Sequence, residues 1–474
     1  MIKKVLSLFA LSFSATVFAQ EIVSDNAALT DAYTLAVNTV DINVRRGVLA
    51  AGGDYGGEWT RDIAINSWNA VSLMRPDVAA NSLWSVTVNN KDTVGHQYWD
   101  KILWVIAAHN HYIATGDLAF LKEAYPCASN TMKELEQSAF DKKYGLFTGP
   151  SVFNDGIAAY PEPIFEKNNN SSSVLDHKNS KVIKTLSTNS VYYGAYLSLV
   201  EMAKILKADD ADIQAYQQKA KKLKSNILKN FYAEKENKLY YLIDNLGKTD
   251  KSQEALGLSF AVIFNILNKE QALKITQTAV TSQYGITSIW PDFPRYSKEH
   301  VGRHNNIIWP MVNGFFAQAS IAAGDQKTFL KEFNGLTQLA LDADKGDYNF
   351  REIFNPNTGK PDGGWQANGD AHPDFHWESC RLQTWSATAY LNMVHNGLLG
   401  LRLENNAITF SPFLPNNIHY LEINKLKYQG AQLTVIVKGT GTNIKSFTVD
   451  GKIQTSYTLN ANLKGEHKVE IELG

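Results

Sequence analysis

The 474-residue sequence contains very little cysteine, with only Cys127 and Cys380 along its length. Two cysteines exclude a fold held together by several disulfides and a zinc site built from four cysteines. A single long-range disulfide between them stays open. We expect no cysteine nucleophile, no bound metal and no other cofactor.

Net charge is also nearly absent, because 46 basic residues balance 47 acidic ones to give −1. The chain therefore lacks the basic surface that attracts a phosphate backbone, and we expect no nucleic-acid partner. Beyond the N-terminus, no apolar run approaches the roughly 20 residues that a membrane span requires. We expect no membrane insertion, and composition leaves the oligomeric state open.

The N-terminus "MIKKVLSLFALSFSATVFAQ" has the pattern of a cleavable signal peptide over residues 1–19. Two lysines precede an apolar run, and small residues precede a cut between Ala19 and Gln20. No cysteine near the cut could accept a lipid anchor. The pattern predicts a periplasmic or secreted protein.

Apolar residues at helical spacing recur between about residues 28 and 398. Alternate connections between these segments are long and rich in Gly, Pro and Trp, which is typical of functional loops. The pattern predicts a mainly α fold, an (α/α)6 toroid of helical hairpins whose long loops gather at one end. The expected helices cover residues 30–48, 62–75, 100–115, 118–138, 188–206, 209–231, 253–267, 269–281, 307–323, 326–341 and 383–399.

After residue 400 the sequence alternates apolar and polar residues with a period of two, broken by Gly and Asn turns. This alternation predicts a small C-terminal antiparallel β domain of the sandwich type. The sequence thus divides into a barrel over residues 20–399 and a β domain over residues 400–474.

The segment "YGGEWTRDIAINSW" places an indole, a guanidinium and two carboxylates immediately before an expected helix. A structural role is one explanation, because Thr60 or Asp62 could cap the helix and Arg61 could pair with Glu58. The other explanation is a polar binding site at the start of the helix.

Three carboxyl groups on the long loops could serve acid–base chemistry. Asp155 follows an apolar stretch, where partial burial could raise its pKa enough to keep it protonated, although Asp-Gly is also a common turn. Glu352 stands near Phe and Pro and could instead pair with Arg351 or Lys360. Glu378 stands at the expected start of the last helix, where the helix dipole favours a carboxylate whatever its function.

These residues carry a resemblance to the six-hairpin (α/α)6-barrel glycosidases, nearest to the clan of processing α-glucosidase I, mannosylglycerate hydrolases and inverting trehalases. "WTRD" at 59–62 resembles a motif of glucoamylases and debranching α-1,6-glucosidases. "EIFNPNTG" at 352–359 is similar to the motif that carries the general base in the α-glucosidase I clan. "TWSATAYL" at 384–391 is similar to the helix that follows that base.

The resemblance implies a role for each motif residue. Arg61 and Asp62 would hold the hydroxyls of the sugar that is cleaved, and Trp59 would form part of the pocket wall. Glu352 would be the general base, and Asp155 the general acid. A glucoamylase-like alignment would instead assign the base to Glu378, and this alternative stays open.

Further stretches resembling the superfamily supply additional candidates for binding sugar. "RHNNIIWPMVNGFF" opens a helix with polar groups beside a tryptophan, although a buried Trp packed on Pro is commoner than a sugar platform. The additional substrate-binding candidates are Asp100, Asn189, His304, Asn305, Trp309, Trp365 and Glu378.

The sequence therefore predicts an exported, inverting exo-glycoside hydrolase that cleaves α-glucosidic bonds in oligosaccharides by acid–base catalysis. A hydrolase of another sugar, such as an α-rhamnoside, mannoside or uronoside, is the first alternative. A disaccharide phosphorylase and a non-catalytic glycan-binding protein are less favoured readings of the same residues.

Overall fold

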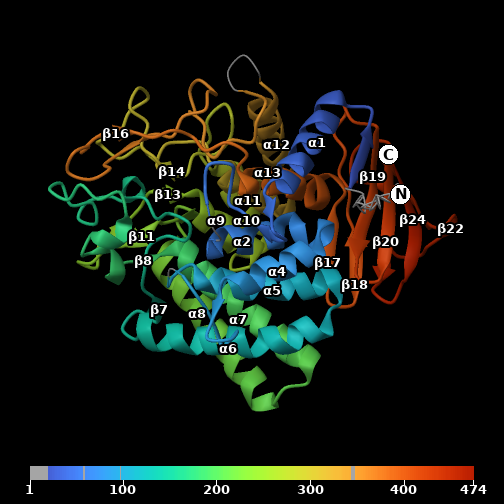
Figure 1. Cartoon of the computed structure of the whole chain (residues 1–474), viewed down its shortest axis with the longest axis horizontal. Helices are drawn as coiled ribbons and strands as arrows, with labels where there is room; N and C mark the ends of the chain where they lie inside the picture. Colours follow the sequence, from blue (N-terminus) through green and yellow to red (C-terminus); the bar gives the residue numbers. More distant parts are fainter. Residues whose placement is uncertain (1–19, 57–58, 97, 343–346) are drawn as a thin grey trace, which may run out of the picture.

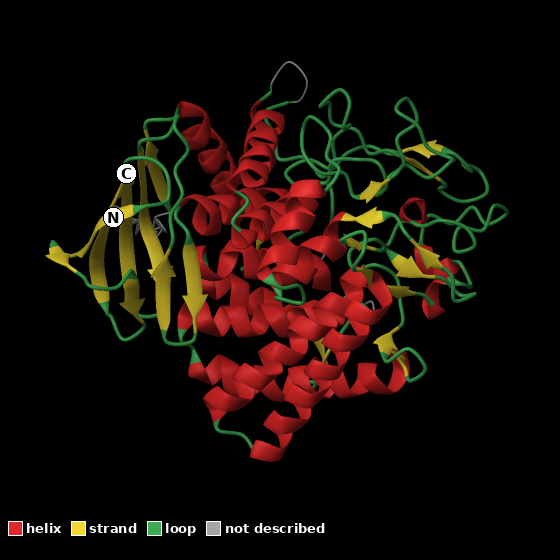
Figure 2. Cartoon of the chain, turned by 180° about the vertical axis from the view of Figure 1, so that it is seen from behind, coloured by secondary structure: helices red, strands yellow, loops and turns green. Residues whose placement is uncertain are grey.

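The computed structural model describes residues 20–56, 59–96, 98–342 and 347–474. The predicted signal peptide lies outside these residues. A body of helices fills the centre of the molecule, between a large sheet on one side and a group of long loops on the other (Figures 1 and 2).

Six helices pack side by side in a closed inner ring, each against the next, with the last helix returning to the first. In ring order they are α2 (Thr60–Asn66), α5 (Lys101–Thr115), α7 (Leu186–Leu206), α9 (Ala255–Ile263), α11 (Pro310–Ala323) and α13 (Thr384–Asn392). Short segments extend two of them: η1 (Ser67–Val71) and α3 (Ser72–Met74) follow α2, and η5 (Met393–Leu398) follows α13.

A second set of helices covers the outside of this ring. They are α1 (Ala27–Ile42), α4 (Pro76–Ser85), α6 (Leu118–Ala139), α8 (Asp210–Phe231), α10 (Lys269–Thr278) and α12 (Gln326–Leu341). Each connection from an inner helix to the following outer helix is short, as at residues 116–117 and 324–325. This arrangement is the predicted (α/α)6 toroid.

The two layers differ in burial for a simple physical reason. An inner helix has neighbours on all sides, so every residue of α2 and α13 is buried. An outer helix such as α8 buries only one stripe, at Tyr216, Ala220, Leu223, Ile227 and Phe231. Close packing inside the ring also requires a small residue: a Cβ on Gly314 of α11 would lie 2.6 Å from that of Ala389 of α13.

The long connections all run from an outer helix to the N-terminus of the next inner helix. Residues 140–185, 279–309 and 347–383 are the longest described stretches, and they gather at one end of the ring, as predicted (Figure 1). Short strand pairs stiffen them, including β13 (Gln253–Glu254) with β14 (Ile289–Trp290) and β15 (Trp365–Gln366) with β16 (Phe375–His376). The fold thus collects loop side chains over the N-termini of the inner helices.

A six-stranded sheet covers the other side of the helical body. Its strand order is β1 (Glu21–Ser24), β19 (Tyr420–Tyr428), β20 (Ala431–Lys438), β24 (Gly465–Leu473), β21 (Ile444–Val449) and β22 (Lys452–Ile453). A second sheet joins β17 (Leu401–Glu404), β18 (Ala407–Phe410) and β23 (Thr458–Asn460). All pairs in these two sheets are antiparallel except β20 with β24, which is parallel.

Three details differ from the sequence prediction. Residues 76–85 form α4, a helix that the prediction did not include. Helix α1 ends at Ile42 because a tight hairpin follows, with Arg46 and Gly47 in left-handed conformations, although apolar spacing continues to residue 48. Strand β1, assigned to the barrel by the predicted boundaries, pairs with β19 at the edge of the C-terminal sheet.

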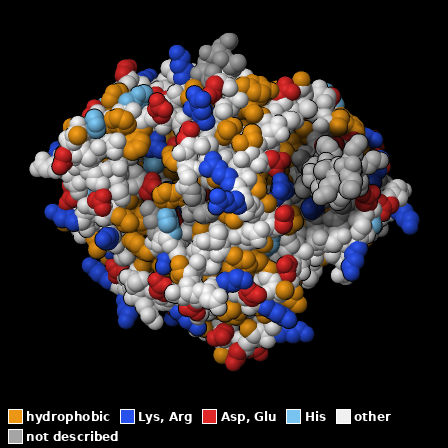
Figure 3. Space-filling view, viewed as in Figure 1, with side chains coloured by type: hydrophobic (Ala, Val, Ile, Leu, Met, Phe, Trp, Pro, Cys, Tyr) orange, Lys and Arg blue, Asp and Glu red, His pale blue; other side chains and the backbone are white. Residues whose placement is uncertain are grey.

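Other expectations concern cysteine, membranes and charge. Cys127 and Cys380 are both buried and free, so they do not form the disulfide that the sequence left open. Within the described ranges, no helix has both the length and the apolarity to cross a membrane. Acidic and basic side chains are interspersed over the face shown in Figure 3, in keeping with the balanced composition.

Candidate functional site

A cavity of about 380 Å³ opens among the long loops, above the N-terminus of α2. Such a volume lies near the lower end of the range typical of small-molecule sites, roughly 300–1,000 Å³. Its wall combines carboxylates, arginines and indoles: Ala51, Tyr55, Trp59, Arg61, Asp62, Asp155, Gly156, Ser172, Ser173, Arg303, His304, Trp309, Glu352, Gln366, Trp377, Gln383 and Trp385.

The start of α2 supplies one polar wall. Trp59, and not Thr60 or Asp62, occupies the N-cap position, and its side chain makes no capping hydrogen bond. The capping explanation of this motif is therefore wrong. The alternative partner Glu58 lies outside the described residues, and Arg61 instead directs its guanidinium at carboxylates from three segments.

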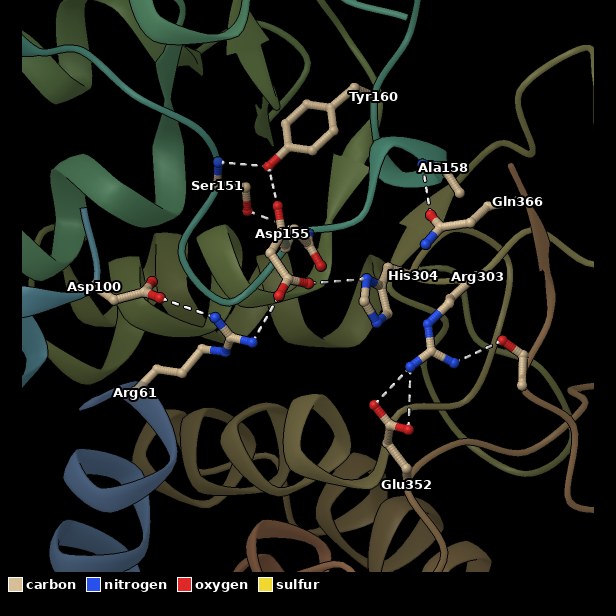
Figure 4. A network of polar contacts seen from close by, with 12 residues as sticks. Arg61, Asp100, Ser151, Asp155, Ala158, Tyr160, Arg303, His304, Glu352 and Gln366 are labelled. Carbon is tan, nitrogen blue, oxygen red and sulfur yellow. Dashed lines mark hydrogen bonds and ion pairs between the residues drawn. The ribbon is translucent and has the colours of Figure 1, made fainter. Parts of the chain in front are cut away.

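Arg61 lies among Asp155, Asp100 and Asp62. Its Nη2 is 2.6 Å from Asp155 Oδ2 and its Nη1 is 3.2 Å from Asp100 Oδ2 (Figure 4). Its Nε is 3.7 Å from Asp62 Oδ2. Burial raises the pKa of Asp62 to about 7 and that of Asp100 to about 6, although Arg61 opposes both shifts.

The pKa of Asp155 moves in the opposite direction. Burial alone would raise it, but the charge of Arg61, with a smaller contribution from Arg303, outweighs burial and holds the pKa below its ordinary value of 3.8. The prediction that an apolar loop keeps Asp155 protonated is therefore wrong for the unliganded protein. The sequence could not reveal this because Arg61 and Asp155 are 94 residues apart.

Glu352 lies at a separate part of the wall with its own arginine (Figure 4). Arg303 Nη2 donates to both carboxylate oxygens, at 3.0 and 3.2 Å, while Arg303 Nη1 donates to the carbonyl of Gly363. The Tyr55 hydroxyl donates to Glu352 Oε2 at 2.9 Å. The Glu352 side chain is only 4% exposed, and these bonds fix the orientation of its carboxylate in the cavity wall.

His304 occupies the wall near Asp155, with its Nδ1 3.9 Å from Asp155 Oδ1. Its ring stacks on Trp309, with centroids 4.2 Å apart. Burial and the charge of Arg303 lower the pKa of His304 to about 3, so the imidazole is neutral. Neither ring nitrogen has a hydrogen-bond partner among the described residues.

Three tryptophans form much of the remaining wall. Trp309 meets Trp385 edge to face at 5.4 Å, and the guanidinium of Arg303 lies 5.2 Å from the ring centre of Trp377. Within the described part of the chain, the indole N–H groups of these three tryptophans lack hydrogen-bond partners, and so does the side-chain amide of Gln383. Rings with neighbouring unsatisfied polar groups suit the faces and hydroxyls of a sugar.

The structure brings together most of the residues that the motifs pointed to. The cavity wall contains both predicted catalytic residues and five predicted substrate-binding residues: Asp155, Glu352, Trp59, Arg61, Asp62, His304 and Trp309. Among the described residues, the wall does not include Asp100, Asn189, Asn305, Trp365 or Glu378.

Three of these five are fully buried in the protein. Asp100 is fully buried and supports Arg61 from behind the wall. Asn189 bonds to the backbone of Phe147 and Thr185, so it joins α7 to the preceding loop and does not bind a ligand. Asn305 is also fully buried.

The other two predicted residues lie toward the surface. Trp365 stacks between His300 and His376, with ring centres 4.6 and 4.7 Å away. Glu378 is exposed and precedes the last inner helix by several residues, because α13 begins only at Thr384. Its predicted place at a helix start is therefore wrong, and the cavity gives no support to Glu378 as the base.

Sequence reasoning also missed part of the wall, notably Tyr55, Gln366, Trp377, Gln383 and Trp385. Tyr55 begins the same glycine-rich segment that contains Arg61. Trp377 and Gln383 flank the segment that contains Glu378. Trp377 directly precedes Glu378, and an aromatic residue beside a candidate acid is the sequence signal that could have identified it.

Comparisons with known proteins concern the family and the fold of this chain. The family profile described as "Mannosylglycerate hydrolase MGH1-like glycoside hydrolase domain" matches residues 66–378. A second profile, the C-terminal domain of glycosyl hydrolase family 65, matches residues 401–471. No curated protein sequence gives a significant match.

Solved structures share the fold at low sequence identity. A sialidase superposes with a TM-score of 0.68 at 14% identity, over 90% of this chain and 40% of its own. The GH78 rhamnosidase of Bacillus sp. GL1 gives 0.61 at 13%, over 96% and 44%. The GH63 mannosylglycerate hydrolase of Thermus thermophilus in complex with glucose gives 0.57 at 14%, over 77% and 99%. The chain thus spans less than half of the first two proteins.

The position of Asp62 in the cavity predicts a role in binding substrate. Asp62→Asn keeps the size of the side chain but removes its charge, so kcat/KM for an α-glycoside should fall roughly 10- to 100-fold, the cost of a hydrogen bond to a charged group. The melting temperature should change by less than about 4 °C. Steady-state kinetics and thermal unfolding of the same preparation check both expectations.

Asp41→Asn is the matched control, because Asp41 also pairs with an arginine: its Oδ1 is 2.6 Å from Arg75 Nη1. Neither residue of this pair lines the cavity. Its kinetics should equal those of the unaltered protein. Unchanged kinetics in Asp62→Asn, or equal losses in both variants, would return Asp62 to a structural role.

Proposed function

Because the chain belongs to the MGH1-like family of glycoside hydrolases, we propose that it is an inverting exo-acting enzyme that cleaves a terminal α-linked neutral sugar, with glucose as the preferred candidate. Asp155 acts as the general acid and Glu352 as the general base. Export through the predicted signal peptide is part of this proposal.

One observation carries the proposal: two carboxylates with separate arginine partners line one small cavity. An inverting glycosidase needs a carboxylic acid at the leaving oxygen and a carboxylate that activates water on the other face of the sugar. Separate arginines hold the two carboxyl groups at different parts of the wall, and the proposal requires a sugar and a water molecule to bind between them.

The charge of the wall favours a neutral sugar over a uronic acid. Arg303 is bonded to Glu352, and Arg61 is bonded to Asp155 and Asp100. A substrate carboxylate would have to compete with these groups for the arginines while lying near Asp155 and Glu352. Mannosides and rhamnosides stay open as substrates, since both kinds of hydrolase occur among the similar structures.

Hydrolysis is favoured over phosphorolysis and over glycan binding without catalysis. A phosphorylase replaces the base with a phosphate site, whereas we assign the base to Glu352, a carboxylate that accepts three hydrogen bonds. A non-catalytic glycan-binding protein would not need carboxyl groups at both positions.

The assignment of the base is tested by two substitutions, Glu352→Gln and Glu378→Gln. Glu352→Gln should lower kcat on a natural α-glycoside by at least about 100-fold, because the amide cannot accept a proton from water. Glu378→Gln, at the exposed glutamate of the neighbouring segment, should retain full activity. A fully active Glu352→Gln beside an inactive Glu378→Gln would transfer the base to Glu378.

Asp155 must gain a proton before it can act as the acid, because Arg61 keeps it ionised in the unliganded protein. A sugar in the cavity offers hydroxyl oxygens that compete with Asp155 for the hydrogen bonds of Arg61, and it removes water from both groups. Weaker pairing leaves burial as the main influence on the pKa of Asp155, so substrate binding raises that pKa.

This account predicts a difference between two pH profiles. A general acid must be protonated, so the rate falls as pH rises through its pKa. The fall in kcat/KM, which reports the unliganded protein, should begin at lower pH than the fall in kcat, which reports the complex. Rates measured between pH 3 and pH 9 give both profiles.

Asp155→Asn supplies the control for the pH experiment. It should lose activity on a disaccharide but retain more on a glycosyl fluoride, whose leaving group needs little protonation. The pKa of Asp62 is about 7. If both profiles instead fall near pH 7, and if Asp62→Asn abolishes that fall, then Asp62 is the general acid.

A further inference from the structure

A second cavity, of about 430 Å³, lies beside the first. It is lined by one polar loop and by the turn that faces it: Asn168, Asn169, Asn170, Ser171, Ser172, Gly369 and Asp370. Ser172 belongs to the walls of both cavities, so the two spaces are adjacent. We call this second space the asparagine groove.

The loop and the turn are bonded to each other. The Gly369 N–H donates to the Asn170 carbonyl at 2.8 Å, and Asn170 Nδ2 donates to Asp370 Oδ1 at 3.2 Å. Open space lies where a side chain on Gly369 would point. These bonds fix the groove as a built feature of the surface.

The same loop is bonded to the segment that carries Asp155. The Val174 N–H donates to the Asp155 carbonyl at 2.7 Å, and the Ile157 N–H donates to the Ser172 carbonyl at 2.9 Å. A backbone bridge also pairs Gly156 with Ser173. The loop that lines the asparagine groove is therefore bonded directly to the segment that carries Asp155.

The role of a general acid indicates which part of a substrate would lie in the asparagine groove. A general acid must contact the oxygen of the leaving group, so the leaving group lies on the side of Asp155. The described lining of the groove consists of amides, hydroxyls, one carboxylate and glycine, with no aromatic ring. Such groups recognise hydroxyls by hydrogen bonding and offer little to an apolar group.

We propose that the asparagine groove is the binding site for the leaving group, and that it takes a polyhydroxylated leaving group, a second sugar or a sugar-like polyol. This inference rests on the proposed function, in which Asp155 is the acid. The groove makes the enzyme selective for glycosides of hydrophilic alcohols over aryl glycosides.

The test combines Asn168→Ala and Asp370→Ala in one variant, which removes two polar side chains that line the groove and not the catalytic cavity but keeps the backbone bond of Gly369 to Asn170. The substrates are a glucose disaccharide (kojibiose, nigerose or trehalose) and α-glucosyl fluoride, whose leaving group is too small to enter the groove. The double variant should lose about 10-fold in kcat/KM on the disaccharide, the effect of one or two lost hydrogen bonds, and should match the unaltered protein on the fluoride.

Lys181→Ala is the control, since Lys181 is exposed at the end of the same loop and lines neither cavity. It should leave both rates unchanged. Equal losses of the double variant on both substrates would show that the groove only supports the fold, and no loss on either would also overturn the proposal. If the unaltered protein cleaves neither substrate, the glucoside assignment itself fails, and the groove proposal falls with it.

Discussion

The ion pair between Arg61 and Asp155 is the interaction on which the site most depends. It joins the first helix of the inner ring to a loop 94 residues further along the chain. A buried guanidinium is tolerated only when carboxylates and hydrogen bonds replace its lost water, and removing one partner of such a pair costs about 3–5 kcal/mol. Asp155, Asp100 and Asp62 supply these carboxylates. Arg61 thus holds the candidate acid at the cavity wall and also sets its protonation.

The second arginine gives the cavity its functional asymmetry. Arg303 and Tyr55 orient Glu352 through three hydrogen bonds, whereas Asp155 shares Arg61 with two other carboxylates. Two carboxyl groups that look alike in the sequence therefore meet different surroundings, as separate acid and base roles require. Neutral His304 and the indoles complete the wall without adding charge.

Much of the fold and part of the site could be predicted from the sequence. The inner and outer helices repeat apolar residues at a local period, so α5, α6, α8 and α12 were predicted within one or two residues. The motifs "WTRD" and "EIFNPNTG" identified the start of α2 and Glu352, both at the cavity. Errors arose where distant segments decide the outcome: Asn189 bonds to Phe147, and the pKa of Asp155 follows Arg61.

The stereochemistry of the product tests the central claim most directly, because it follows from Asp155 and Glu352 acting on opposite faces of one sugar. Proton NMR of the first product released from an α-glycoside, recorded before the anomers equilibrate, identifies its configuration. Our account predicts a β-anomer, formed by water that Glu352 activates. An initial α-anomer would show retention, and it would contradict the assignment of Glu352 as the base of an inverting hydrolase.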